Sequence, residues 1–143
     1  MKITDVTVHV LEAALSEPFH WSINRADVRA SAVVEIVTDT GLSGFGECLG
    51  PARACAAMVE AYAPLLLGAD ALASELIWQT LYDRFRDQGQ KGVPIAALSG
   101  VDIALWDLKG KHFGAPVHQL MGGPLRSEIE AYATGTYRKD QGD

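Results

Sequence analysis

Polar and apolar residues alternate with a period of two in the N-terminal third of the chain. In residues 5–10, a valine stands at every second position and the residues between are polar. This is the pattern of a strand with one buried face. Two further β-rich runs, residues 30–38 and 42–48, are joined by a short turn in which Gly41 can take a positive φ. The pattern therefore predicts a three-stranded antiparallel sheet.

The segment between the first two predicted strands, residues 14–28, does not alternate. It reads "ALSEPFHWSINRADV", and its polar residues, proline and asparagine favour a long loop over a strand. Phe19, His20 and Trp21 are consecutive in this loop. They have two interpretations, a hydrophobic plug beneath the loop or part of a lid over a ligand.

The period changes to that of a helix after Glu47. A first helix is expected over residues 52–63, with Pro51 suited to its first turn and Pro64 breaking or kinking it. A second amphipathic helix is expected from Ser74, a plausible N-cap, to just before Gly89.

A third helix is expected from about Pro94 to about Phe113, ended by Gly114. A last turn then precedes residues 128–137, whose alternation predicts a strand. This strand follows helices and has no sequential strand partner.

Asp102 and Asp107 stand among apolar residues of the third helix. At 100° per residue they lie about 140° apart around the axis, so they cannot converge on one metal ion or one bond. Lys109, one heptad beyond Asp102, and Lys111, four residues beyond Asp107, are their expected partners. We expect both carboxylates to be structural.

Composition narrows the possible functions. The chain has 143 residues, a net charge of −6 and two cysteines. No basic cluster suits a nucleic acid, no apolar run suits a membrane span, and no secretory signal opens the sequence. A cytoplasmic protein with reduced thiols is expected.

Chemistry-bearing residues outside the third helix are few. Glu47 ends the strand "GFGE", either as a buried acid bonded to backbone N–H groups or as a carboxylate facing a cleft. Arg53 stands at a helix start, where the dipole disfavours a cation, so binding a carboxylate would compensate. The histidines are not spaced as metal ligands, and the glycines of "GFG" lack the setting of a phosphate loop.

The stretch "ALSGVDIALWDLKGKHFGAPVHQLMGG" resembles the signature of the mandelate racemase and muconate lactonizing branch of the enolase superfamily. "MKITDVTVHVLE", "TDTGLSGFGE" and "RDQGQKG" resemble that family's N-terminal capping domain. "ECLGPAR", "RDQGQKG" and "AYATGTY" resemble its acid-sugar members, the galactarolactone cycloisomerases and related sugar-acid dehydratases.

The resemblance implies an α+β fold: a three-stranded antiparallel sheet and a helical bundle over residues 1–123, then residues 124–143 as the start of a (β/α)₈ barrel otherwise absent from this chain. It implies a Mg²⁺-dependent isomerase or lyase that abstracts the proton α to a carboxylate of a sugar acid or its lactone. The barrel would hold the Mg²⁺ and every catalytic residue, so this chain alone is expected to be inactive.

The resemblance also implies that residues 16–29 and 47–53 fold over the barrel mouth as a lid. The expected substrate-binding residues are Phe19, His20, Trp21, Arg25, Glu47 and Arg53. The expected partners are a small carboxylate substrate, the missing barrel and, in the intact enzyme, further copies in a homo-oligomer. A racemase or muconate-type cycloisomerase, or a non-catalytic binding or assembly module, remains the alternative. The reading frame beyond Asp143 would distinguish them.

Overall fold

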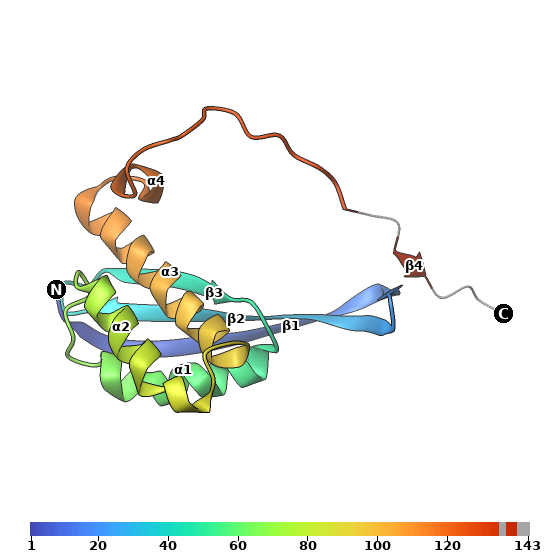
Figure 1. Cartoon of the computed structure of the whole chain (residues 1–143), viewed down its shortest axis with the longest axis horizontal. Helices are drawn as coiled ribbons and strands as arrows, with labels where there is room; N and C mark the ends of the chain where they lie inside the picture. The colour runs from blue at the N-terminus through green and yellow to red at the C-terminus, as the bar shows by residue number, and fades with distance from the viewer. Residues whose placement is uncertain (135–136, 140–143) are drawn as a thin grey trace.

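The computed structural model describes residues 1–134 and 137–139 (Figure 1). Its strands are β1 (Ile3–Trp21), β2 (Asn24–Thr38), β3 (Ser43–Cys48) and the two-residue β4 (Arg138–Lys139). Its helices are α1 (Ala52–Leu66), α2 (Ser74–Arg84), a 3₁₀ turn η1 (Arg86–Gln88), α3 (Val93–Phe113) and α4 (Val117–Leu120).

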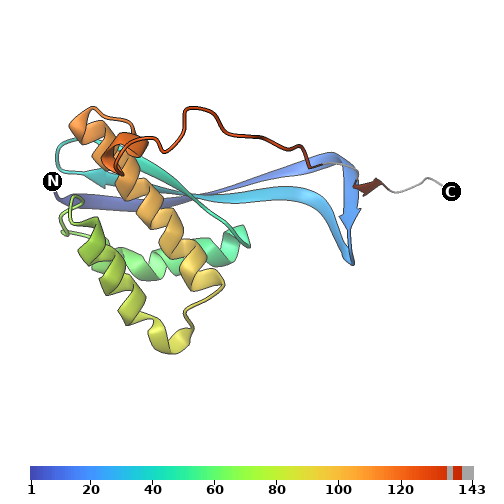
Figure 2. The same cartoon turned by 45° about the horizontal axis from the view of Figure 1, so that its top comes forward.

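The sheet is antiparallel with the order β3-β2-β1-β4. The predicted three-stranded antiparallel sheet is confirmed, and Gly41 in the β2–β3 turn has φ 81°. The prediction of a loop over residues 14–28 is wrong, because β1 and β2 stay paired as far as Trp21 and Asn24. This part of the hairpin projects beyond the helices (Figures 1 and 2). No helical layer buries one of its faces, so its sequence lacks the alternation that identifies a half-buried strand.

The helices cover one face of the sheet, where Ala32, Val34 and Ile36 of β2 are fully buried. Helix α3 packs closely on β3 (Figure 2). The approach depends on two glycines of "GFG": a Cβ at Gly46 would overlap the carbonyl oxygen of Gly100, and one at Gly44 would overlap that of Ala104. These glycines therefore allow the helix to approach the strand.

The third predicted helix is confirmed. Helix α3 ends before Gly114, which has a positive φ of 61°. Pro64 does not break α1, which continues to Leu66. The carbonyl that loses its N–H partner belongs to the exposed Glu60, where water can satisfy it. Pro51 lies just before α1 as its N-cap residue and is not in its first turn.

Ser74 is not the N-cap of α2, since Ala73 occupies that position. Ser74 is buried, and its hydroxyl accepts a hydrogen bond of 2.5 Å from Lys109 Nζ. Helix α2 ends at Arg84, and η1 completes the segment before Gly89.

The predicted strand over residues 128–137 is wrong in its described part, because residues 128–134 form no strand. Residues 135 and 136 lie outside the described residues. Ile129 and Tyr132 are 81% and 90% exposed, and a strand requires a neighbour with which to exchange backbone hydrogen bonds. The short strand β4 has such a neighbour, because it pairs with Phe19 and His20 of β1.

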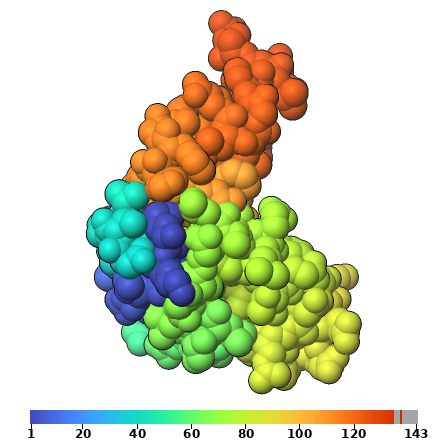
Figure 3. All heavy atoms as spheres, turned by 90° about the vertical axis from the view of Figure 1, so that its left-hand side faces the viewer, coloured from blue at the N-terminus to red at the C-terminus, as the bar shows by residue number. Residues whose placement is uncertain are grey.

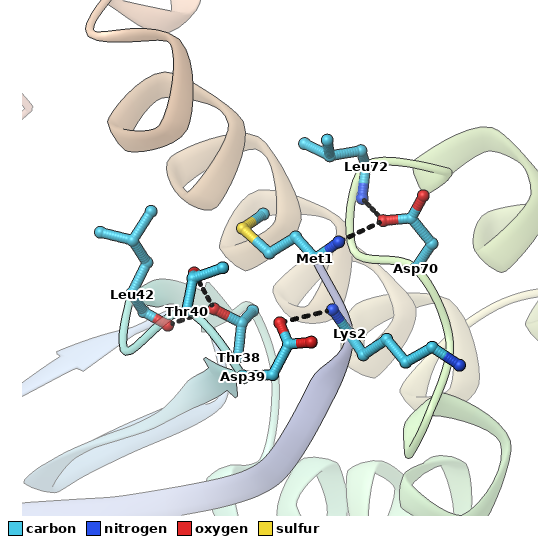
Figure 4. Close-up of polar contacts among 8 residues, drawn as sticks. All are labelled: Met1, Lys2, Thr38, Asp39, Thr40, Leu42, Asp70 and Leu72. Atoms are coloured by element: carbon cyan, nitrogen blue, oxygen red, sulfur yellow. Dashed lines mark hydrogen bonds and ion pairs between the residues drawn. The ribbon is translucent and has the colours of Figure 1, made fainter.

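The N-terminus is fixed between two loops, as the contact of blue, cyan and green surfaces in Figure 3 shows. The Met1 amino group lies 3.5 Å from Asp70 Oδ1, and the Lys2 N–H donates to Asp39 Oδ1 at 2.9 Å (Figure 4). Asp70 also accepts a hydrogen bond from Leu72 N at 3.1 Å. The start of β1 is thereby bound to the α1–α2 loop and the β2–β3 turn.

Candidate functional site

The projecting end of the β1–β2 hairpin, residues 16–29, is called the arm below. Its tip carries an aromatic group in which the Phe19 and Trp21 rings are 5.8 Å apart between centroids. The Tyr137 ring lies 4.6 Å from Phe19, and the Arg29 guanidinium lies 4.9 Å above the Phe19 ring. Trp21 remains 44% exposed, so this group presents both aromatic surface and positive charge to its surroundings.

His20 and Arg25 occupy opposite positions across the arm. The Arg25 Nε donates to Asp27 Oδ1 at 2.7 Å, in a pair exposed to solvent. The four predicted residues of this segment, Phe19, His20, Trp21 and Arg25, are thus gathered at the tip by strand pairing, because residues directly opposite in a hairpin lie about 5 Å apart.

Glu47 lies at the base of the arm. It is exposed, and its carboxylate accepts a hydrogen bond of 2.6 Å from the Ser31 hydroxyl on β2. The interpretation of Glu47 as a buried acid bonded to backbone N–H groups is therefore wrong. Its position at the end of an edge strand leaves the side chain facing outward.

Arg53, in the first turn of α1, binds a carboxylate of this same chain. Its Nε and Nη2 each donate to Glu12 at 3.0 Å in a bidentate pair. The Arg53 side chain is nevertheless 79% exposed. The pair compensates for a cation at a helix N-terminus, and the exposure leaves guanidinium surface accessible from outside.

An open hollow of about 490 Å³ lies at the base of the arm. Its lining includes Glu12, Arg29, Ser31, Glu47 and Leu49. Sequence reasoning missed Glu12, Arg29 and Ser31 as lining residues because it did not pair the two strands beyond residues 10 and 30, where Leu11 lies opposite Ser31 and Ala13 lies opposite Arg29. Continuing the period of two through the hairpin would have placed Arg29 and Ser31 on one face.

The six predicted binding residues form two groups and do not line one pocket. Four lie at the tip of the arm, while Glu47 and Arg53 lie at its base. Phe19 lies seven positions beyond Glu12 on β1, a separation of roughly 23 Å at the rise of a strand. Arg29 belongs to both regions, since it lines the hollow and also lies over Phe19.

The two aspartates of α3 differ in their surroundings. Asp107 accepts hydrogen bonds from Phe45 N at 2.8 Å and from Lys111 Nζ at 2.7 Å, so it joins α3 to β3 as a structural acid. Asp102 does not form its expected pair with Lys109, which donates to Ser74 instead. Burial, reinforced by the nearby negative charge of Glu75, raises the pKa of Asp102.

Metal-ligating side chains are dispersed across residues 1–134 and 137–139, where no three His, Cys, Asp or Glu side chains gather as a site for an ion. These residues do not fit a Mg²⁺ ion, which requires several oxygen ligands around one point. Cys48 and Cys55 are buried free thiols, and burial raises the pKa of Cys48 to about 11. In the same described part of the chain, no helix has the length and apolar character to cross a membrane.

Comparison with known proteins identifies the fold. Residues 3–122 match the family described as "Mandelate racemase / muconate lactonizing enzyme, N-terminal domain". The chain belongs to this family. Its sheet and helices are the family's capping domain, and similar solved structures include members of the enolase superfamily.

The chain is 52% identical, over all of its 143 residues, to D-galactarolactone cycloisomerase of Agrobacterium fabrum. It is 39% identical over 137 residues to D-galactonate dehydratase of Pectobacterium atrosepticum. It is also similar to the crystal structure of 3,6-anhydro-D-galactonate cycloisomerase from Zobellia galactanivorans, with 38% identity, a TM-score of 0.85 and 94% of this chain covered. The chain spans 38%, 31% and 36% of the lengths of these three proteins.

Proposed function

We propose that this chain is the substrate-gating N-terminal part of a longer enzyme that removes the proton α to the carboxylate of a sugar acid or its lactone. The observation that carries the proposal is the 52% identity to D-galactarolactone cycloisomerase over the whole chain. The similarity to D-galactonate dehydratase supports the same class of substrate. The outcome of the reaction is cycloisomerisation or dehydration.

Chemistry belongs to a following barrel in this proposal. The described residues do not fit a Mg²⁺ site, so the ion that stabilises an enolate-like intermediate in such enzymes would be held by that barrel. The domain boundary is proposed near residue 123, where Gly122 and Gly123 both have positive φ after α4.

The contribution of this chain is to close over the substrate. The arm carries exposed aromatic surface at its tip and the hollow at its base, and we assign substrate contacts to Phe19, His20, Trp21, Arg25, Glu47 and Arg53. Aromatic walls exclude water, and guanidinium groups bind carboxylates in bidentate fashion. The exposed Arg53 is suited to the distal carboxylate of a sugar diacid, in competition with Glu12.

The test is a substrate panel on the longer protein encoded by the uninterrupted reading frame. D-galactarolactone, a matched sugar diacid and a matched sugar monoacid are incubated in deuterated water with and without Mg²⁺. We expect Mg²⁺-dependent exchange or loss of the α-proton from at least one of them. If a folded protein that binds Mg²⁺ neither exchanges nor removes the α-proton of any of the three compounds, the proposed substrate class is contradicted.

A further inference from the structure

Glu12 connects the base of the arm to helix α1. It lies on β1 opposite Ala30 of β2, close to where the arm begins. Its two carboxylate oxygens accept hydrogen bonds of 3.0 Å from Arg53 Nε and Nη2, although the two residues are 41 positions apart in the sequence. The pair therefore joins the strand that carries the arm to the first turn of α1, and so it joins the two segments to which we assign substrate contacts.

The β1–β2 ladder is interrupted shortly beyond Glu12. Ala14 pairs with Val28, and the next pair is Phe19 with Ala26, so β1 has four residues between these pairs where β2 has one. Extra residues in one strand of a hairpin bend that strand and change its direction. The arm extends from this interruption beyond the helices (Figure 1). The contact of Glu12 with α1 therefore holds the last regularly paired part of the hairpin, from which the arm starts.

The Glu12 side chain has the same chemistry as the ligand proposed for Arg53. Both are carboxylates, and Glu12 occupies the guanidinium edge formed by Nε and Nη2. A second carboxylate can make the same bidentate contact with that edge only by replacing Glu12. The Arg53 and Glu12 side chains are 79% and 39% exposed, and exposed ion pairs are held weakly. The replacement therefore disturbs no part of the core.

We propose that Glu12 is a specificity-determining residue, which occupies Arg53 in the absence of substrate and is displaced by the distal carboxylate of a sugar diacid. The inference rests on the proposed function, which assigns Arg53 to that carboxylate, and it adds the residue that the substrate must replace. Displacement of Glu12 also releases the base of the arm from α1, so binding of a diacid is coupled to the position of the arm.

The charges at the base of the arm explain why Glu12 distinguishes between substrates. The hollow is lined by the carboxylates of Glu12 and Glu47 and by the guanidinium of Arg29. A diacid that takes Arg53 breaks the ion pair and leaves the Glu12 charge beside Glu47. A monoacid with an uncharged hydroxyl group at its distal end leaves the Glu12–Arg53 pair intact. Glu12 therefore weakens the binding of diacids and has little effect on monoacids.

The first experiment is a double-mutant cycle on the longer protein. Calorimetry measures the dissociation constants of galactarate, a sugar diacid, and galactonate, the matched monoacid, with Mg²⁺ omitted to prevent turnover. We expect Glu12→Gln to tighten galactarate binding about two- to fivefold, which is the range that an exposed ion pair supports, and to leave galactonate binding unchanged. In an Arg53→Ala background, Glu12→Gln should no longer favour galactarate over galactonate.

The matched control removes a carboxylate charge from another exposed ion pair. Asp87 on η1 lies 3.8 Å from Arg86 Nε and is 92% exposed. Asp87→Asn should leave both dissociation constants unchanged. A gain in galactarate binding as large as that of Glu12→Gln would show that net charge, and not displacement of Glu12, sets the affinity, and it would overturn the inference.

The second experiment observes the displacement itself. The Arg53 Nε–H resonance is identified in the ¹⁵N spectrum of the longer protein by its loss in Arg53→Lys. Without ligand it should differ between the wild type and Glu12→Gln. Saturating galactarate should bring it to the same position in both proteins, because the same carboxylate then binds the guanidinium, whereas galactonate should not move it in the wild type. Galactarate that binds without moving the wild-type resonance would overturn the inference.

The remaining outcomes separate this inference from the proposed function. Equal galactarate binding by the wild type and Glu12→Gln, in a longer protein that turns over sugar acids, would overturn the role of Glu12 and leave the proposed function standing. An equal gain for galactarate and galactonate in Glu12→Gln would show general repulsion of anions and would also overturn it. Failure of every variant to bind either compound would overturn both the inference and the proposed substrate class.

Discussion

At the residue scale, the proposed recognition of substrate rests on single side chains of the arm and of its base. Arg53 binds the Glu12 carboxylate in bidentate fashion and remains 79% exposed. An exposed pair of this kind contributes less than about 1 kcal/mol to stability. Removing Arg53 should therefore test recognition without a large effect on folding.

We predict that Arg53→Ala in the longer protein lowers kcat/KM about 10- to 150-fold for a sugar diacid, because a charge-assisted contact contributes about 1.5–3 kcal/mol. A monoacid without the distal carboxylate should lose less. Trp21→Ala should lower kcat/KM for both substrates to similar extents, since an aromatic side chain excludes water without distinguishing charge. Arg84→Ala on α2 is the control, and equal losses for diacid and monoacid in Arg53→Ala would assign Arg53 a scaffold role.

We predict that Asp107 stabilises the folded domain. Asp107→Ala removes the acceptor of the Phe45 N–H and the partner of Lys111, which should lower the free energy of unfolding by about 1–3 kcal/mol. Asp107→Asn keeps an oxygen for the Phe45 N–H and should lose less. Urea denaturation measures both, and an Asp107→Ala variant with the wild-type midpoint would contradict this role.

Asp70 should make stability depend on pH in the acid range. The hydrogen bond from Leu72 N, together with the charge of the Met1 amino group, lowers the pKa of Asp70 below its ordinary 3.8. Because the folded state favours the ionised form, this contribution is present above about pH 4 and is lost as the pH falls through the folded pKa. Asp70→Asn should flatten the fall of the urea midpoint below pH 4, and an unchanged slope would show that the contact does not contribute.

At the residue scale, the sequence predicted contacts between residues that are close along the chain. The Asp107–Lys111 pair could be predicted because residues four positions apart in a helix lie on the same face. The partner of Lys109 and the partner of Arg53 could not be predicted, because Ser74 and Glu12 lie 35 and 41 residues away in sequence.

At the scale of elements, buried alternation and helical periodicity predicted the sheet and α3. The arm was missed because no helical layer covers either of its faces, so buried positions such as Ala26 do not recur with a period of two. Residues 128–134 show the converse: they alternate as a strand does, yet without a neighbour they form none. The alternation of polar and apolar residues indicates which face of a strand is suited to burial. Whether the strand forms depends on a neighbouring strand with which it can pair.

The contact between α3 and β3 yields a prediction for glycine. Gly46→Ala places a methyl group against the Gly100 carbonyl, so we expect a loss of roughly 1–3 kcal/mol in the free energy of unfolding. Ser43→Ala on the same strand is the control and should be nearly neutral. An unchanged urea midpoint for Gly46→Ala would show that α3 can move away from the strand without cost.

At the scale of the whole molecule, the domain has a well-packed body and a projecting arm that the helices do not cover (Figure 1). Four of the six predicted binding residues lie on the arm, and Glu47 and Arg53 lie at its base. The similarity to D-galactarolactone cycloisomerase covers all of this chain and 38% of that protein. We propose that the arm and its base contact a following domain and its substrate.

Turnover of a sugar-diacid lactone tests the central claim, that this chain gates a reaction performed elsewhere in the polypeptide. It is measured in the 143-residue chain, the longer protein, and the longer protein with residues 16–29 replaced by a two-residue turn. We predict no turnover by the chain, Mg²⁺-dependent turnover by the longer protein, and a loss of 100-fold or more in kcat/KM without the arm, as expected when substrate positioning is removed. Turnover by the chain alone, or undiminished turnover without the arm, would contradict the account.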